Sequence, residues 1–208
     1  EEKMQNIATD LFSKWADNGK DRGMAQSHSP AVNQILDKTL SETKSNFNFV
    51  DAGCGNGWVV RKVRQMPNCK SCFGVDGAKS MIQNAKKIDP DGEYHLEDLL
   101  LWSPKNKIDF VFSMEVFYYF KSPKTLTKHI VDKWLAPGGM LVIGLDHYIG
   151  NPDSYTWSED LNVHMTLMDE KEWVQIFKSA GLSSCYSFRV NASNEFPGTL
   201  CVVGQLKN

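Results

Sequence analysis

The chain has 208 residues, which suits one domain that buries roughly two-thirds of its unfolded surface. Lys and Arg number 23 against 25 Asp and Glu, and this balance argues against the dominant basic face of a nucleic-acid-binding protein. No apolar run approaches the ~20 residues that span a bilayer, and the first residues lack a signal-peptide core. The five cysteines are an odd number, unlike a disulfide framework. We therefore expect a cytoplasmic monomer or homodimer with reduced thiols and no membrane partner.

Residues 1–44 predict a helical cap on one side of the domain. The apolar residues of the first eighteen recur at spacings of three and four, as in an amphipathic helix, and Gly19 is a fitting end for it. Ser29 followed by Pro30 is a good N-cap and first turn, so we expect a second helix to begin there. The polar residues in between form a link, and His28 lies in that loop.

A glycine-rich stretch then follows an apolar run. The run is rich in β-formers and ends at Asp51, after which glycine occupies positions 53, 55 and 57. The next residues, with Val59, Val60 and Val63, could share one helical face. This order predicts a strand, a tight turn and a helix. Glycines remove Cβ atoms, so backbone N–H groups can approach a ligand closely, and we expect a nucleotide-type ligand.

Two familiar nucleotide-binding loops do not fit this stretch. The dinucleotide fingerprint requires a third glycine at the position that Trp58 occupies. The phosphate-binding loop of Walker type requires a following Gly-Lys-Ser/Thr, which is absent from the sequence.

A second strand is predicted to end at Asp76, 19 residues after Gly57. In nucleotide folds an acid at about this distance accepts hydrogen bonds from a ribose diol. Asp76 could equally cap the helix expected over 78–87. The Cys69-x-x-Cys72 pair precedes it without a second such pair or histidines at zinc-site spacing, so we expect ordinary thiols and no metal.

Strand-like and helix-like segments continue to alternate through 93–96, 109–115, 126–135 and 140–144. The run at 109–115 is apolar throughout, as in a central parallel strand that is buried on both faces. The alternation predicts a doubly wound parallel sheet with its ligands at the carboxyl ends of the strands.

The last third of the chain begins with a long polar and aromatic segment over 146–166, which is typical of a lid or binding loop. A helix is expected after Asp169, which can cap it. The strands expected at 186–190 and 200–204 have no helix between them, so they predict an antiparallel hairpin at one sheet edge. We find no internal repeat or interior linker and expect a single domain.

Four motifs, in this order, resemble those of the class I S-adenosylmethionine-dependent methyltransferases, and the resemblance covers nearly all of residues 45–207. They are the glycine loop, the ribose-binding strand, the adenine-edge segment and the turn before the fifth strand: Asp51-x-Gly53-x-Gly55-x-Gly57, Gly74-Val75-Asp76, Glu97-Asp98-Leu99 and Leu135-x-Pro137-Gly138-Gly139-x-Leu141. The resemblance implies an α/β fold with a doubly wound, mostly parallel seven-stranded sheet, an antiparallel C-terminal hairpin and helices on both faces. We divide the domain 1–208 into a helical cap, a donor-binding core, a substrate-side loop, and a C-terminal helix and hairpin: 1–44, 45–146, 147–168 and 169–208.

The resemblance also implies S-adenosylmethionine as methyl donor and S-adenosylhomocysteine as product. Asp76 would bind the ribose, Asp98 and Leu99 the adenine edge, and Asp51 with the glycine loop the methionine end. The N-terminal helices could close the pocket with Trp15 or Met24. The residues expected at the donor are Trp15, Asp51, Gly53, Cys54, Gly55, Gly57, Asp76, Gly77, Asp98, Leu99 and Met114.

The acceptor side is less explicit in the sequence. The fourth strand is not followed by the Asn/Asp-Pro-Pro-Tyr/Phe motif of nucleic-acid amino-methylating enzymes, and there is no Pro-Cys pair for cytosine C5 chemistry. A neutral histidine is the natural proton acceptor near pH 7, and His147, directly after the fifth strand, ranks before His28. Glu115 could bind a cationic acceptor, act as a base or cap the next helix, and Tyr118 could face the pocket.

We therefore expect a methyltransferase that transfers a methyl group in line to a small molecule. One alternative is a protein or RNA methyltransferase, which would need a long groove or a basic rim. The other is a non-catalytic donor-binding subunit that needs a partner. An NAD-dependent enzyme is disfavoured by Trp58.

Overall fold

The computed structural model describes residues 7–40, 43 and 45–208, so the expectations for the first six residues lie outside the described part. Seven strands form one sheet in the order β3-β2-β1-β4-β5-β7-β6. The first five strands pair in parallel, whereas β7 runs antiparallel to both of its neighbours. The strands are β1 Phe47–Ala52, β2 Cys69–Asp76, β3 Glu93–Leu96, β4 Ile108–Met114, β5 Leu135–Leu145, β6 Ser183–Val190 and β7 Thr199–Gln205. The doubly wound sheet with a C-terminal hairpin is thereby confirmed.

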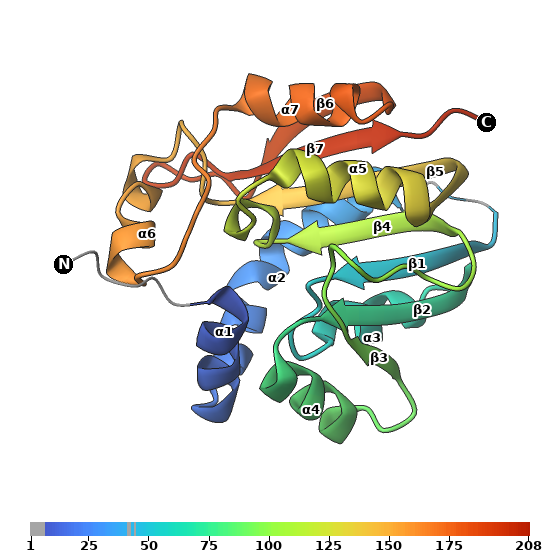
Figure 1. Cartoon of the computed structure of the whole chain (residues 1–208), viewed down its shortest axis with the longest axis horizontal. Coiled ribbons are helices and arrows are strands. Elements are labelled where there is room, and N and C mark those ends of the chain that lie inside the picture. The colour runs from blue at the N-terminus through green and yellow to red at the C-terminus, as the bar shows by residue number, and fades with distance from the viewer. Residues whose placement is uncertain (1–6, 41–42, 44) are drawn as a thin grey trace.

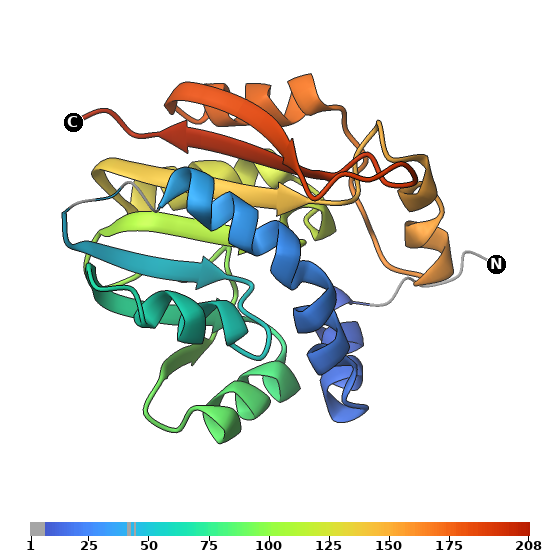
Figure 2. The same cartoon turned by 180° about the vertical axis from the view of Figure 1, so that it is seen from behind.

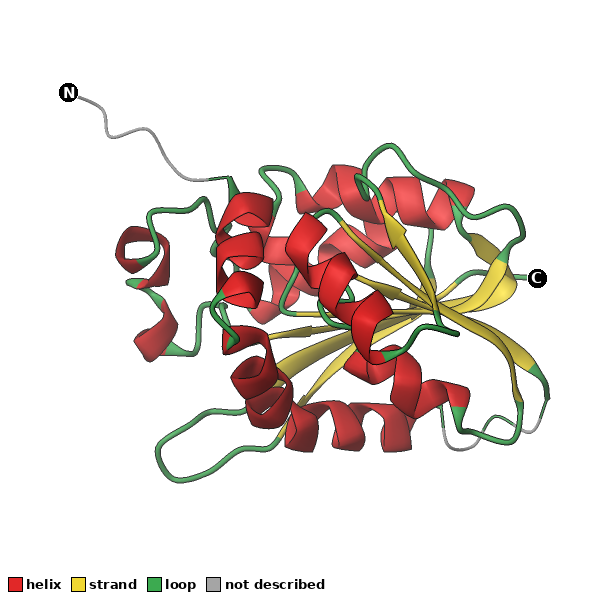
Figure 3. Cartoon of the chain, turned by 90° about the horizontal axis from the view of Figure 1, so that it is seen from below, coloured by secondary structure: helices red, strands yellow, loops and turns green. Residues whose placement is uncertain are grey.

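Helices cover both faces of this sheet (Figure 1, Figure 3). α5 and α7 pack together on one face, and α2 and α3 pack on the other, which Figure 2 shows from behind. α1 packs against α4 beside the β3 edge. The helices are α1 Ala8–Asp17, α2 Lys20–Thr39, α3 Trp58–Arg64, α4 Lys79–Ile88, α5 Pro123–Lys133, α6 Trp157–Asp160 and α7 Glu170–Ser179, with short 3-10 turns at Phe117–Tyr119 and Pro152–Ser154.

The sheet has a separate apolar core on each face because successive strand residues point to opposite sides. Phe49 stacks with Phe110 and Phe112 on the α2 and α3 face. Its neighbour Val50 belongs to the opposite core, together with Trp134 near the end of α5. Burial on both faces explains why the central strands read as continuous apolar runs.

One prediction about the N-terminal cap is wrong. The residues expected to form a polar link are helical: α2 begins at Lys20, directly after the left-handed Gly19, and Pro30 lies inside the helix. Pro30 therefore does not mark the start, and its missing N–H is accommodated within the helix. His28 consequently lies on α2 and not in a loop.

The long segment after β5 is well packed against the body of the protein. It contains the turn Pro152–Ser154 and the one-turn helix α6. His147, Tyr148 and Ser154 are buried in it. All five cysteines of the chain are free thiols. None of the helices in residues 7–40 and 45–208 combines the length and apolar composition needed to cross a membrane.

The start of α7 allows a test of local stability away from the ligand end of the sheet. Asp169 accepts a hydrogen bond from the Glu172 N–H at 2.8 Å, and the Glu172 carboxylate accepts one from the Asp169 N–H at 2.8 Å. Asp169→Ala removes this capping box and should lower the free energy of unfolding by ~1 kcal/mol in chemical denaturation. Glu195→Ala, at an exposed loop position, should leave it unchanged. Equal stabilities of the two variants would contradict the capping role.

Candidate active site

The turn between β1 and α3 depends on glycine. Gly53, Gly55 and Gly57 have φ angles of +80°, +53° and +80°, a region that other residues rarely adopt. A Cβ on Gly53 would lie 2.3 Å from a methyl group of Val116, so a side chain does not fit there. The turn therefore keeps its backbone open to the carboxyl end of the sheet.

Asp76, at the end of β2, holds this turn in place. Its carboxylate accepts hydrogen bonds from the N–H of Gly55 and from the N–H of Ala78, both at 2.8 Å. Asp76 is therefore not the N-cap that the sequence allowed: Ala78 is the N-cap of α4, which has no side-chain cap, and Asp76 bonds to the Ala78 N–H just before the helix. Each carboxylate oxygen can accept a further hydrogen bond, so the bond to the turn does not use up the group.

Two cavities adjoin at this end of the sheet, sharing Phe12, Gly53, Asp76 and Val116. The larger has a volume of about 620 Å³ and includes Gly77, Glu97, Asp98, Leu99 and Tyr119 in its lining. The smaller, about 90 Å³, is lined by residues of α1, α2, the glycine turn and the end of β4: Phe12, Asp21, Met24, Ala25, His28, Asp51, Gly53, Cys54, Gly55, Asn56, Trp58, Val59, Asp76, Met81, Met114, Glu115 and Val116.

Asp51 gives the smaller cavity an unsatisfied acceptor. The residue is only 3% exposed. Oδ1 of its carboxylate has no hydrogen-bond partner among the described residues. Burial, followed by the nearby charge of Asp76, raises the pKa of Asp51 well above its usual range. A buried, unpaired carboxylate oxygen in a cavity fits a ligand with a cationic or N–H group, such as the methionine ammonium of S-adenosylmethionine.

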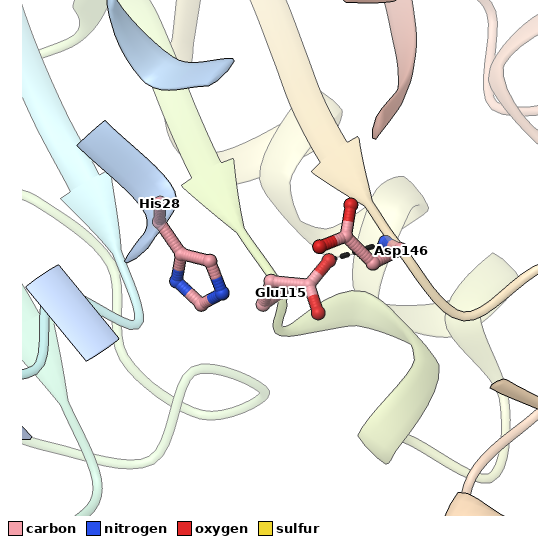
Figure 4. Close-up of side chains that lie close together, drawn as sticks. All are labelled: His28, Glu115 and Asp146. Atoms are coloured by element: carbon pink, nitrogen blue, oxygen red, sulfur yellow. Dashed lines mark hydrogen bonds between the residues drawn. The ribbon is translucent and has the colours of Figure 1, made fainter. Parts of the chain in front are cut away.

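A second group of polar side chains lies beyond Met114, where β4 and β5 end. His28 from α2, Glu115 after β4 and Asp146 after β5 each place one nitrogen or oxygen within 4.8 Å of the others (Figure 4). Glu115 accepts hydrogen bonds from the Tyr118 hydroxyl at 2.5 Å and from the Asp146 N–H. Asp146 accepts one from the Thr199 hydroxyl at 2.6 Å. One nitrogen and two carboxylates in this arrangement could hold a cation, either a metal ion or an ammonium group.

Enclosure shifts the protonation of all three side chains. Burial, then the charge of Asp146, raises the pKa of Glu115 well above its usual range. Burial also raises the pKa of Asp146, against the hydrogen bond from Thr199. Burial lowers the pKa of His28, although the charge of Asp146 opposes this shift. His28 is therefore neutral near pH 7 and can accept a proton.

The backbone of Glu115 has a φ of +59°, which is uncommon for a residue with a side chain.

Most of the residues expected at the site line one of the two cavities. In the smaller are His28, Asp51, Gly53, Cys54, Gly55, Asp76, Met114 and Glu115; in the larger are Gly77, Asp98 and Leu99. Four line neither: Trp15, Gly57, Tyr118 and His147. Trp15 packs edge-to-face on Phe12, which lines both. Tyr118 reaches the site only through its bond to Glu115.

His147 lies in a buried position away from both cavities. It is only 1% exposed, and the carbonyl groups of Ser154 and Met165 face its ring. Trp157 stacks on it, with ring centroids 6.2 Å apart. Burial lowers its pKa. Its ring also packs edge-to-face on Tyr118, with centroids 5.3 Å apart, and its Nε2 has no hydrogen-bond partner among the described residues.

Helix α2 contributes a whole face to the site, whereas the sequence predicted only His28, in a loop, and Met24 there. Asp21, Met24, Ala25 and His28 line the smaller cavity from one helical face, at the spacing i, i+3, i+4 and i+7. Asp21 also accepts a hydrogen bond from the Asn56 side-chain amide at 3.0 Å, which ties α2 to the glycine turn. The helical spacing of these four residues could have predicted the helix. It does not stand out as a hydrophobic pattern, because Asp21 and His28 are polar.

Comparison with known proteins identifies the family. A family model described as a methyltransferase domain matches residues 10–185, so the chain belongs to this methyltransferase-domain family. It is 28% identical over 158 residues to a trans-aconitate 2-methyltransferase of Escherichia fergusonii, covering 76% of this chain and 56% of the relative. It is 29% identical over 144 residues to a malonyl-[acyl-carrier protein] O-methyltransferase of Ilyobacter polytropus, covering 66% and 54%. The chain thus spans about half the length of these curated relatives.

Solved structures agree on the fold. A chain in the complex between the Haloferax volcanii Trm112 methyltransferase activator and a methyltransferase superposes with a TM-score of 0.84 and 28% identity, covering 95% of this chain and 98% of that one. The N-methyltransferase NodS of Bradyrhizobium japonicum, solved with S-adenosylhomocysteine, has a TM-score of 0.65, covers 88% and 87%, and at 19% identity shows the fold alone.

Because the pKa of Asp51 is raised, its replacement by Asn should stabilise the folded protein while removing a binding group. The ionised carboxylate of Asp51 destabilises the folded state. This cost is absent below the ordinary pKa near 4 and grows as the pH rises from there to the raised pKa. Without a ligand, Asp51→Asn should gain stability over the wild type, and this gain should be larger at pH 8 than at pH 4 by about 1 kcal/mol or more, measured by denaturant unfolding. Asp132→Asn, on a half-exposed side chain of α5, should show no such difference between the two pH values. An unchanged pH slope in Asp51→Asn would contradict the assignment.

Proposed function

We propose that the chain transfers the methyl group of S-adenosylmethionine to a small molecule bound between α2 and the ends of β4 and β5. The observation that supports this best is the pair of adjoining cavities, with Asp76 in both and His28 and Glu115 in the smaller one. The donor supplies an electrophilic methyl group on a positively charged sulfur. The chain has to bind the donor, align an acceptor and exclude water.

The donor site is assigned by the position of each side chain. Asp76 accepts hydrogen bonds from the ribose beside Gly77, while Asp98 and Leu99 bind the adenine edge in the larger cavity. Asp51 binds the methionine ammonium beside the glycine turn, and Met114 packs near the sulfur. Phe12, from α1, covers the junction of the cavities in the place that we expected for Trp15.

His28 is the better candidate for the proton acceptor at the site. It lines the smaller cavity with Glu115, whereas His147 faces backbone carbonyls elsewhere. A positioned base of this kind contributes roughly 10²- to 10⁴-fold to a proton-transfer step. The 147–168 loop lines neither cavity. Its role as a loop on the substrate side is therefore still only a prediction from the sequence.

A small-molecule acceptor is supported by two of the relatives, whose names specify trans-aconitate and malonyl-[acyl-carrier protein]. An RNA acceptor has support from a tRNA U34 carboxymethyltransferase of Pseudoalteromonas atlantica, 31% identical over 107 residues. The smaller cavity is lined by Asp21, Asp51, Asp76 and Glu115 and by no Lys or Arg of the described residues. Such a lining is unfavourable for a nucleic-acid backbone.

The proposed activity has a direct test. Purified protein is incubated with S-adenosylmethionine, with either a pool of metabolites or bulk tRNA, and the formation of S-adenosylhomocysteine is measured. We expect turnover with the metabolites only. Turnover with tRNA alone would contradict the small-molecule assignment.

A second candidate is a subunit that is active only with a partner. The Haloferax volcanii chain with TM-score 0.84 is in a complex with an activator. If this chain needs a similar activator, the isolated protein should bind neither S-adenosylmethionine nor S-adenosylhomocysteine in calorimetry. Micromolar binding of both, without binding of NAD, would instead support a donor site that is complete on its own.

Replacement of Asp76 tests the ribose assignment. Asp76→Ala should weaken donor binding by ~1–3 kcal/mol, roughly 10- to 100-fold, because hydrogen bonds to a charged group are lost. Asp109→Ala is the matched control. Asp109 also accepts a hydrogen bond from a backbone N–H, that of Asn48 at 2.8 Å, but it lies at the start of β4, away from the carboxyl ends of the strands. It should bind the donor like the wild type. A folded Asp76→Ala protein with unchanged affinity would remove Asp76 from the site.

A further inference from the structure

Two carboxylates beside the donor site, Glu115 and Asp146, are grouped with a single basic side chain of the described residues, that of His28. Glu115 and Asp146 lie together with His28, and each already receives a hydrogen bond from a hydroxyl group, Tyr118 for Glu115 and Thr199 for Asp146. The smaller cavity, which His28 and Glu115 line, has no Lys or Arg in its described lining. Two enclosed carboxylates without a counter-ion favour a ligand that brings positive charge.

This charge disfavours a carboxylate acceptor of the kind named for one curated relative. Trans-aconitate, the acceptor in the name of one relative, is a polycarboxylate. A carboxylate acceptor in this cavity would meet Glu115 in the lining, with Asp146 close behind it, and like charges in an enclosed site repel strongly. The larger cavity has one cationic side chain in its described lining, Lys79, among the donor residues.

We propose that His28, Glu115 and Asp146 bind the acceptor as an amine, so that the enzyme is an N-methyltransferase of a small cationic amine. The inference rests on the proposed function and specifies its substrate class. A primary ammonium has three N–H donors, and the three side chains offer three acceptors within 4.8 Å of one another.

The same three groups account for the proton. An ammonium nitrogen has no free electron pair, so it has to lose a proton before it can attack. The N–H bond breaks and the proton passes to the neutral ring of His28. The nitrogen electron pair then forms the new bond to the methyl carbon, and the S–C bond breaks with its electrons staying on sulfur. Glu115 and Asp146 retain the remaining N–H groups and stabilise the protonated His28.

Sinefungin tests the proposal without knowledge of the acceptor. This donor analogue has a C–NH₃⁺ group in place of S⁺–CH₃ and so presents an ammonium where the methyl group would be transferred. In calorimetry, the wild type should bind sinefungin about 10-fold or more tightly than S-adenosylhomocysteine, the scale of a charge-assisted hydrogen bond. In Glu115→Gln and in Asp146→Asn this preference should fall towards unity. Asp132→Asn, on the half-exposed surface of α5, should retain it.

Each outcome of the titration has a distinct meaning. Equal affinities in the wild type, or a preference that survives both variants, would overturn the amine site while leaving the proposed function intact. Failure to bind either ligand would overturn the proposed function and the inference together. Binding of Mn²⁺ that both variants abolish, without a preference for sinefungin, would overturn the amine site in favour of a metal site.

Turnover with matched acceptors provides an independent readout. Protein with S-adenosylmethionine is offered a set of small primary amines, the corresponding alcohols, and trans-aconitate, and S-adenosylhomocysteine is measured. Methylation confined to the amines would support the proposal. Methylation of trans-aconitate alone or of the alcohols alone would overturn it. So would the absence of any methylation by a protein that binds sinefungin no better than S-adenosylhomocysteine.

Discussion

The ligand end of this protein depends on the hydrogen bond between Asp76 and the Gly55 N–H. That 2.8 Å bond joins the turn after β1 to the end of β2. The turn can adopt its left-handed conformation only because it has glycine at positions 53, 55 and 57. The bond therefore fixes the floor that both cavities share. It also places a half-buried carboxylate among the four residues that the two cavities share.

The helix α2 supplies the other wall and lies against both the glycine turn and the group that we propose for the acceptor. Asp21 bonds to Asn56 in the glycine turn, and His28, two turns further along the same helical face, lies beside Glu115 and Asp146. A single rigid element thus contacts the donor floor and the group proposed for the acceptor. The arrangement keeps several carboxylates buried near one another, and it is unfavourable until cationic ligands compensate for their charge.

The sequence predicted the parts of the fold and site that depend on local patterns. The glycine turn and Asp76 were found because their spacing is short and each residue type has a specific physical reason to be there. The central strands were found because burial on both faces makes them uniformly apolar, as around Phe110 and Val111. The hairpin of β6 and β7 followed from the missing helix between two strands.

The errors arise where a side chain's direction decides its role. His147 was ranked first because it follows β5 directly, and this ranking stays a prediction; the structure shows that Asp146, not His147, lies beside Glu115, since neighbouring strand-end residues point to opposite sides. The start of α2 was missed because the face with Asp21 and His28 lines a cavity and not an apolar core, so it has no simple hydrophobic period. Cavity-lining elements are those for which hydrophobic patterns predict least.

The central claim is that donor and acceptor sites form one continuous space at the carboxyl end of the sheet. A crystal structure of the protein with S-adenosylhomocysteine tests this most directly. We predict the adenine beside Asp98 and Leu99, the ribose on Asp76, the ammonium on Asp51, and the sulfur facing the group formed by His28, Glu115 and Asp146. A ligand bound elsewhere, or one whose sulfur faces away from these three side chains, would contradict the account.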